Sequence, residues 1–262
     1  MRFYIYEREN NLKGCSIQYS SHSSIKKEEK VMINAKILCL AFVHGENRIL
    51  GGQEVKPKYY PFIVRLTKTN CDPLCTGSLV WNGWGVLTAA HCFEEPKIKT
   101  ALAVFNDFQK YKIERKQFTV GIRGYRKYKG TELAIAFLRR KVTEVQSVPI
   151  SRKTPRKGET LRAVGYGMKG LREGSNYLMH IDLQVSRTYA NNIIITKVGR
   201  NNEGTCAGDS GGPLLNLEDG QWKVMATLYG GGYDCQYGRT SGGDRWNSVK
   251  SIFSGSYYVV KP

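Results

Sequence analysis

The residues from Gly204 to Pro213, which read GTCAGDSGGP, could carry covalent chemistry. Ser210 offers a hydroxyl nucleophile, and the glycines around it allow a tight loop that exposes the hydroxyl and lets a substrate backbone come close. The backbone N–H of Gly208, two residues earlier, could face the oxyanion that develops on an attacked carbonyl. We expect Asp209 to be buried in the middle of this loop, where its carboxylate would need a cationic partner. The alternative interpretation is a glycine-rich surface turn with an idle serine.

The run GDSGGP is six consecutive specific residues, and it resembles the nucleophile loop of the trypsin/chymotrypsin family of serine proteases. The resemblance implies that Ser210 attacks a peptide carbonyl and forms an acyl-enzyme. It also implies an oxyanion hole made by the backbone N–H groups of Gly208 and Ser210. Such chemistry requires no cofactor, and we expect none.

Two further residues resemble the rest of the catalytic triad of that family. His91, in the segment LTAAHC, matches the general base, which takes the serine proton and returns it to the leaving amine. A lone histidine is more often a core residue, but these flanking residues favour the catalytic interpretation. The family places an aspartate at the head of an apolar strand, and here the strand 132–138 begins with Glu132; Asp107 follows His91 too closely to fit. Because glutamate reaches one methylene further, the ring or the strand must shift.

The segment RILGG, which begins at Arg48, resembles the activation site of the same family. Cleavage after Arg48 would create a cationic α-amino group on Ile49, the natural partner for a buried Asp209. Their ion pair would order the nucleophile loop only after cleavage. The resemblance therefore implies an inactive precursor and an activating trypsin-like protease.

The expected specificity pocket carries no charge at its base. The family sets that base six residues before the serine, where this chain has Gly204, followed by Thr205. A buried Lys or Arg side chain of the substrate would be unpaired there, so the pocket should prefer apolar or neutral side chains. Gly230 matches the substrate-pairing strand, and Leu228 stands where the family has a serine that helps hold the triad acid.

Short apolar or alternating runs, separated by Gly, Pro and Asn, follow one another from Ile49 onward. This spacing is typical of many strands in an all-β arrangement. The expected strands are 61–66, 77–81, 86–90, 133–138, 161–164, 193–196 and 222–229. Only Trp246 to Phe253 is expected to be helical. The family fold, two six-stranded antiparallel β-barrels with the site between them and a C-terminal helix, would cover residues 49–262.

The seven cysteines indicate an oxidising compartment. By the resemblance, Cys75 pairs with Cys92 and Cys206 with Cys235, and these bridges would brace the histidine and serine loops. Cys71 is then left over in the mature region and is free or intermolecular. No cysteine/histidine spacing suggests zinc, and the four histidines are scattered, so we expect no metal site.

The first 48 residues differ in character from the rest. Residues 1–31 are polar, serine-rich and charged, and we expect them to be disordered. Residues 32–45 combine a basic residue, an apolar run and small residues near the end, as in a secretory signal, and its removal would leave 46–48 as a short propeptide. Two interpretations stay open: translation begins at Met32, or the run is an internal apolar segment.

The chain is strongly basic, with 40 Lys and Arg against 22 Asp and Glu and a formal charge of +18. Residues 1–48 hold eight basic and five acidic residues, which leaves 32 and 17, or about +15, downstream. The excess is either a solvated surface or a patch for a polyanion or an acidic partner. No nucleic-acid motif accompanies it, and there is no apolar stretch of about 18 residues for a membrane span.

These features favour a secreted, extracellular serine endopeptidase that acts on protein or peptide substrates. One alternative is a protease homologue that keeps the fold but has lost useful catalysis and acts as a binding or regulatory module. A basic binding protein unrelated to proteases is the third interpretation. His91, Ser210 and the Arg48–Ile49 junction favour the enzyme, whereas Glu132 and Leu228 favour the homologue.

Overall fold

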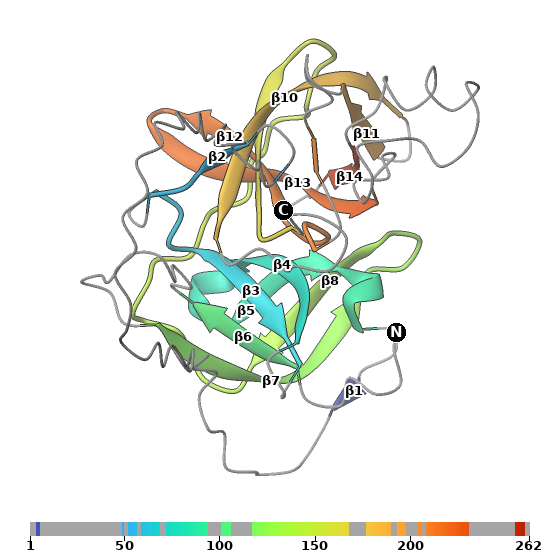
Figure 1. Ribbon diagram of the computed structural model, residues 1–262. Coiled ribbons are helices and arrows are strands. Elements are labelled where there is room, and N and C mark those ends of the chain that lie inside the picture. Colours follow the sequence, from blue (N-terminus) through green and yellow to red (C-terminus); the bar gives the residue numbers. More distant parts are fainter. Residues whose placement is uncertain are drawn as a thin grey trace, which may run out of the picture.

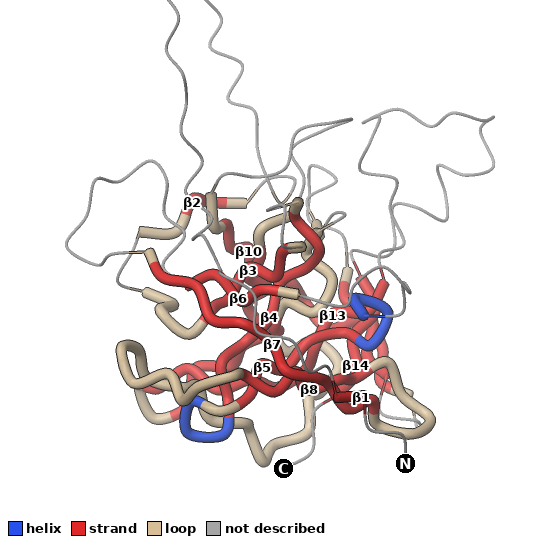
Figure 2. The backbone as a smooth tube through the Cα atoms, turned by 90° about the horizontal axis from the view of Figure 1, so that it is seen from below, coloured by secondary structure: helices blue, strands red, loops and turns tan. Residues whose placement is uncertain are grey.

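The computed structural model describes residues 4–5, 49, 52–56, 59–68, 72–93, 101–105, 117–167, 177–189, 193–197, 204–205, 208–230 and 255–259. Strands dominate this part of the chain (Figure 2), and its helical segments are two short 3-10 turns, η1 (Trp81–Gly83) and η2 (Ala90–Phe93). The strands form two seven-stranded sheets that lie one above the other (Figure 1). The expectation of a mostly-β protein is therefore confirmed.

The first sheet closes on itself. Its order is β1-β7-β6-β3-β4-β5-β8, and β7 also pairs with β8, so β3 to β8 form a closed six-stranded antiparallel barrel. The strand β1 adds two residues at the edge of β7. The bounds are β1 (Tyr4–Ile5), β3 (Ile63–Thr67), β4 (Pro73–Val80), β5 (Gly85–Ala89), β6 (Leu102–Phe105), β7 (Phe118–Lys127) and β8 (Leu133–Leu138).

The second sheet has the order β11-β14-β13-β12-β9-β10-β2, and β10 pairs with β11 as well. Along β10, alternate side chains from Met179 to Val185 are buried, as expected for a strand with one face on a core. The bounds are β2 (Gln53–Glu54), β9 (Thr160–Gly165), β10 (Met179–Thr188), β11 (Ile193–Thr196), β12 (Pro213–Glu218), β13 (Gln221–Gly230) and β14 (Gly255–Val259).

The hydrophobic core joins the two sheets. The cluster inside the first barrel continues into Tyr166, Leu215 and Val224 of the second half of the chain. A second cluster of buried side chains, which includes Ile49, is formed mainly by the strands of the second sheet. Burial of this much apolar surface fixes the two sheets against each other, so residues at their junction have defined positions.

The expected strands all have counterparts, and the sequence missed several others. From Ile49 onward, the strands that the sequence analysis did not name are β2, β6, β7, β10, β12 and β14. The predicted helix Trp246 to Phe253 lies outside the described residues, so it stays a prediction. Of the extension 1–31 only Tyr4 and Ile5 are described, as β1, and the signal segment 32–45 and the propeptide 46–48 are outside the described residues.

Candidate active site

His91 lies in η2, directly after strand β5 of the first barrel. The register of β5 and β8 pairs Ala89 with Leu133, and the N–H of Ala90 donates to the carbonyl of Glu132 at 2.7 Å. These contacts set the imidazole of His91 beside the Glu132 carboxylate, with 3.6 Å between Nδ1 and Oε2. That separation is an ion-pair contact rather than a formed hydrogen bond. Both side chains are partly exposed, His91 by 36% and Glu132 by 27%.

A cationic side chain also reaches the Glu132 carboxylate. The ammonium of Lys127, at the end of β7, donates to Oε1 of Glu132 at 3.0 Å. Lys127 and His91 therefore use different oxygens of one carboxylate. The sequence analysis did not single out Lys127; its signal was the run KYKGTE, in which a tight turn separates a lysine from a glutamate five residues later.

Strand β4 of the first barrel holds the loop that contains Ser210. The N–H of Thr76 donates to the carbonyl of Ser210 at 2.9 Å, and the Thr76 hydroxyl donates to the carbonyl of Gly208 at 2.9 Å. The hydroxyl of Thr88, on β5, in turn donates to the carbonyl of Thr76 at 2.8 Å. The backbone around Ser210 is thus bonded to the strands that lead to His91.

A disulfide between Cys75 and Cys92 adds a covalent link to this arrangement. Cys75 precedes Thr76, which holds the Ser210 backbone, and Cys92 follows His91. The predicted role of this bridge, bracing the histidine loop, fits these positions. The pairing itself is confirmed.

Glycine is required in the nucleophile loop at Gly211, where the backbone has φ +81°. A Cβ at this position would overlap the Thr88 hydroxyl and would lie 2.9 Å from the backbone nitrogen of Ala89. The N–H of Gly211 also donates to the carbonyl of Leu228 on β13 at 2.7 Å. The loop therefore lies directly against the strand that ends at the histidine turn, and Gly208, with φ +92°, also needs the freedom of glycine.

Asp209 is buried, as the sequence predicts, with 1% of the residue exposed. Its Oδ1 accepts a hydrogen bond of 2.7 Å from the N–H of Gly167, and a Cβ at Gly165 or at Gly167 would overlap its carboxylate. Ile49 lies fully buried in the core cluster of the second sheet. Arg48 lies outside the described residues, and the ion pair between a new α-amino group and Asp209 stays a prediction.

The predicted pocket residues lie in the second half of the chain. Gly204 and Thr205 are buried, and Gly230 ends β13. A Cβ at Gly230 would meet no atom of the described residues within 4 Å. Leu228 is buried in the second core cluster.

The described residues contain one grouping with the spacing of metal ligands: Cys75, His91 and Cys92. The two sulfurs are bonded to each other, so they offer no thiolate to a metal. The second predicted bridge, Cys206 to Cys235, lies outside the described residues, as does Cys71.

Comparison with known proteins agrees with this architecture. A family model described as Trypsin matches residues 49–248. Spermosin of Halocynthia roretzi is 29% identical over 227 residues, which cover 74% of this chain and 58% of spermosin. Granzyme M of Rattus norvegicus is 29% identical over 195 residues, which cover 65% of this chain and 74% of that protein. Snake venom serine protease homolog 1 of Trimeresurus stejnegeri is 27% identical over 261 residues, 89% of this chain and 98% of that protein.

A mostly-β chain with a closed six-stranded barrel, whose histidine turn and GDSGGP loop meet where the two sheets join, has the architecture of a trypsin-like serine protease. With the family match across residues 49–248, the chain belongs to the trypsin family of serine proteases. The resemblance inferred from the sequence motifs is thereby confirmed. Within the described part of the chain, no helix has the length and apolar character needed to cross a membrane.

Proposed function

We propose that this chain is a secreted serine endopeptidase that hydrolyses peptide bonds with Ser210 as nucleophile, His91 as general base and Glu132 as the triad acid. The observation that carries the proposal is the contact between His91 and Glu132, 3.6 Å from Nδ1 to Oε2. It occurs on the turn that the Cys75–Cys92 bridge ties to the strand holding the Ser210 backbone.

The proposed reaction begins when the Ser210 hydroxyl attacks the substrate carbonyl carbon and passes its proton to His91. The Glu132 carboxylate stabilises the imidazolium that forms and favours the tautomer with hydrogen on Nδ1. The N–H groups of Gly208 and Ser210 would donate to the oxyanion, and His91 would then protonate the leaving amine. A gap of 3.6 Å is compatible with this scheme, because catalytic hydrogen bonds often tighten only when substrate is bound.

The finer features of the proposal come from the family. The second sheet would complete the second barrel, and 246–253 would form the C-terminal helix. Cleavage after Arg48 by a trypsin-like protease would activate the precursor. The uncharged position Gly204 supports a preference for apolar or neutral substrate side chains, and the excess of basic residues supports a polyanion or acidic partner.

A second candidate is a homologue that binds partners without useful catalysis. It is favoured by one observation: the acid that should serve His91 makes its shorter contact, 3.0 Å, with Lys127. In this version the junction between the two sheets would be a binding surface only.

The test is labelling of Ser210 by an organophosphonate that reacts with activated serine proteases. Protein cleaved after Arg48 should be labelled on Ser210, whereas Ser210→Ala and an uncleavable Arg48→Gln variant should not be. A separate, unlabelled sample of the cleaved protein should hydrolyse a peptide library after apolar or neutral side chains. If the cleaved wild-type chain and Ser210→Ala show the same background labelling and hydrolysis, the binding-module interpretation replaces the enzyme.

A further inference from the structure

In the hairpin that joins β7 to β8, Lys127 pairs with Ala134, and its side chain reaches diagonally to the proposed catalytic acid Glu132. Its turn is closed by the N–H of Thr131, which donates to the carbonyl of Tyr128 at 3.2 Å, and by Gly130 with φ +73°. The N–H of Tyr128 donates to the carbonyl of Leu133 at 3.0 Å, which continues the ladder below the turn. This geometry fixes the backbones on either side of the turn, from which Lys127 and Glu132 project.

The carboxylate of Glu132 is then held at both ends. Lys127 donates to Oε1 at 3.0 Å, and the Nδ1 atom of His91 lies 3.6 Å from Oε2. A carboxylate with one oxygen anchored by an ammonium can no longer rotate freely about its terminal bonds, so the position of the other oxygen is restricted. The lysine contact thus sets where Oε2 lies relative to the imidazole.

Two features of the chain make such an anchor necessary. Glu132 has one more rotatable bond than an aspartate, so its carboxylate samples more positions. Leu228, on β13, is a hydrocarbon packed in the second core cluster and cannot donate a hydrogen bond to the acid. Among the described side chains, Lys127 donates a hydrogen bond to this carboxylate and His91 makes the ion-pair contact.

We propose that Lys127 is a positioning residue for the catalytic acid: its ammonium holds Oε1 of Glu132 so that Oε2 faces the imidazole of His91. The inference rests on the proposed protease function. Lys127 touches neither the substrate nor the reacting atoms, and it acts through Glu132.

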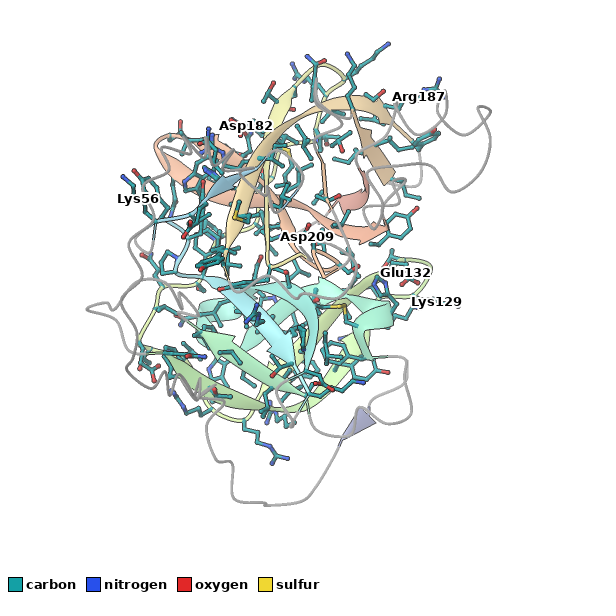
Figure 3. The ribbon with its side chains drawn as sticks, in the orientation of Figure 1. Lys56, Lys129, Glu132, Asp182, Arg187 and Asp209 are labelled. Carbon is teal, nitrogen blue, oxygen red and sulfur yellow. A yellow bond between two sulfur atoms is a disulfide. The ribbon has the colours of Figure 1, made fainter. Side chains whose placement is uncertain are left out.

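The test compares Lys127→Met with Lys127→Arg in the cleaved, full chain. Lys127→Met keeps the length of the side chain and removes the charge, and kcat should fall by about two- to fivefold with KM unchanged, the fold-change that corresponds to a partly exposed ion pair. Lys127→Arg should keep most of kcat, because a guanidinium can donate to the same oxygen. Lys129→Met is the matched control, since it removes one charge from the same hairpin, and it should leave kcat unchanged (Figure 3).

Two further readouts separate positioning from a general structural effect. Added salt weakens partly exposed ion pairs, so it should lower kcat of the wild type more than that of Lys127→Met. In a Glu132→Gln background, Lys127→Met should cost nothing more, because the carboxylate it holds is gone. Thermal unfolding midpoints of all variants show whether each one is folded.

The outcomes distinguish this inference from the proposed function. Labelling of Ser210 together with an unchanged kcat in Lys127→Met overturns the positioning role alone, as does an equal loss in Lys129→Met. Absence of Ser210 labelling in the cleaved wild type overturns the proposed function, and the positioning role falls with it.

Discussion

Glu132 and Asp209 are two carboxylates at the junction of the sheets, and the chain holds them in different ways. Glu132 lies at the side of the first barrel, 27% exposed, and its carboxylate contacts the side chains of Lys127 and His91. Asp209 lies toward the centre of the molecule (Figure 3), 1% exposed, and accepts a hydrogen bond from the backbone of Gly167.

The difference shows which parts of the site are fixed and which are adjustable. A buried carboxylate that loses a hydrogen bond carries a full desolvation cost, about 1–3 kcal/mol or more. A partly exposed ion pair contributes only about 0–1 kcal/mol, because water and salt can replace either partner. We therefore expect changes around Asp209 to damage the fold and changes around Glu132 to alter mainly the rate.

The largest effect is expected for Gly167→Ala. The new methyl group would overlap the Asp209 carboxylate, which is buried and hydrogen-bonded to the Gly167 N–H, so the free energy of unfolding should fall by about 2–3 kcal/mol. Denaturant unfolding measures the loss. Gly230→Ala is the matched control, because a Cβ there meets nothing within 4 Å, and it should change stability little. Equal stability of Gly167→Ala and wild type would show that the buried carboxylate is not rigidly held.

The next effect concerns Glu132, and it should appear in the rate with little change in stability. The backbone of Glu132 is anchored by the N–H of Ala90, so Glu132→Asp shortens only the side chain. The carboxylate then lies where the family places it, and turnover should rise by on the order of tenfold, since a misplacement of ~1 Å can cost on the order of 10²-fold. Glu132→Gln should lower turnover below that of the wild type, because it removes the charge that stabilises the imidazolium.

Steady-state kinetics of the cleaved protein measures the turnover of both variants, and titration with the phosphonate gives the concentration of active sites. A lower turnover in Glu132→Asp would show that the strand already compensates for the longer side chain. In that event the glutamate, with Lys127 as its anchor, is the better acid in this chain.

The sequence predicted the parts of the site that specific motifs carry. The Cys75–Cys92 bridge followed from the family resemblance and the burial of Asp209 from its place in the glycine-rich loop, and the structure bears out both. The strand β7 carries the exposed basic residues Arg123 and Lys127, so it does not stand out as an apolar run in the sequence. A charge run shows no partner until the strand register is known, and the register is what brings Lys127 to Glu132.

The interactions that hold the nucleophile loop were also beyond the sequence. Thr76 and Thr88 are ordinary residues of β-strands, and nothing in their spacing indicates that their hydroxyls bond to backbone carbonyls across the site. The N–H of Gly167 becomes meaningful as a donor only when the fold places it beside Asp209. Such contacts depend on tertiary packing, to which local propensity contributes little.

A third charged cluster lies around the partly buried His180 on β10. The hydroxyl of Tyr60 lies 3.2 Å from Nδ1 of His180, and Arg162 donates to the same hydroxyl at 3.2 Å. Arg162 also makes two hydrogen bonds of 2.7 Å with Asp182. The Tyr60 hydroxyl accepts a hydrogen bond from Arg162, so it can donate its own hydrogen to His180. The Nδ1 atom of His180 must then carry no proton.

The smallest of the three effects is expected in the pH dependence of the free energy of unfolding. Burial, and then the positive charge of Arg162, hold the pKa of His180 below its ordinary value of 6.5, although Asp182 acts in the opposite direction. The unfolded chain takes up this proton as the pH falls through about 6.5 and the folded chain resists it, so the contribution is present above that pH and is lost below it. His180→Gln should flatten the dependence of unfolding free energy between about pH 7.5 and about pH 5.5. Tyr60→Phe should keep most of it, because burial is the main cause. If His180→Gln and wild type lose stability equally as the pH falls, His180 is not the titrating group.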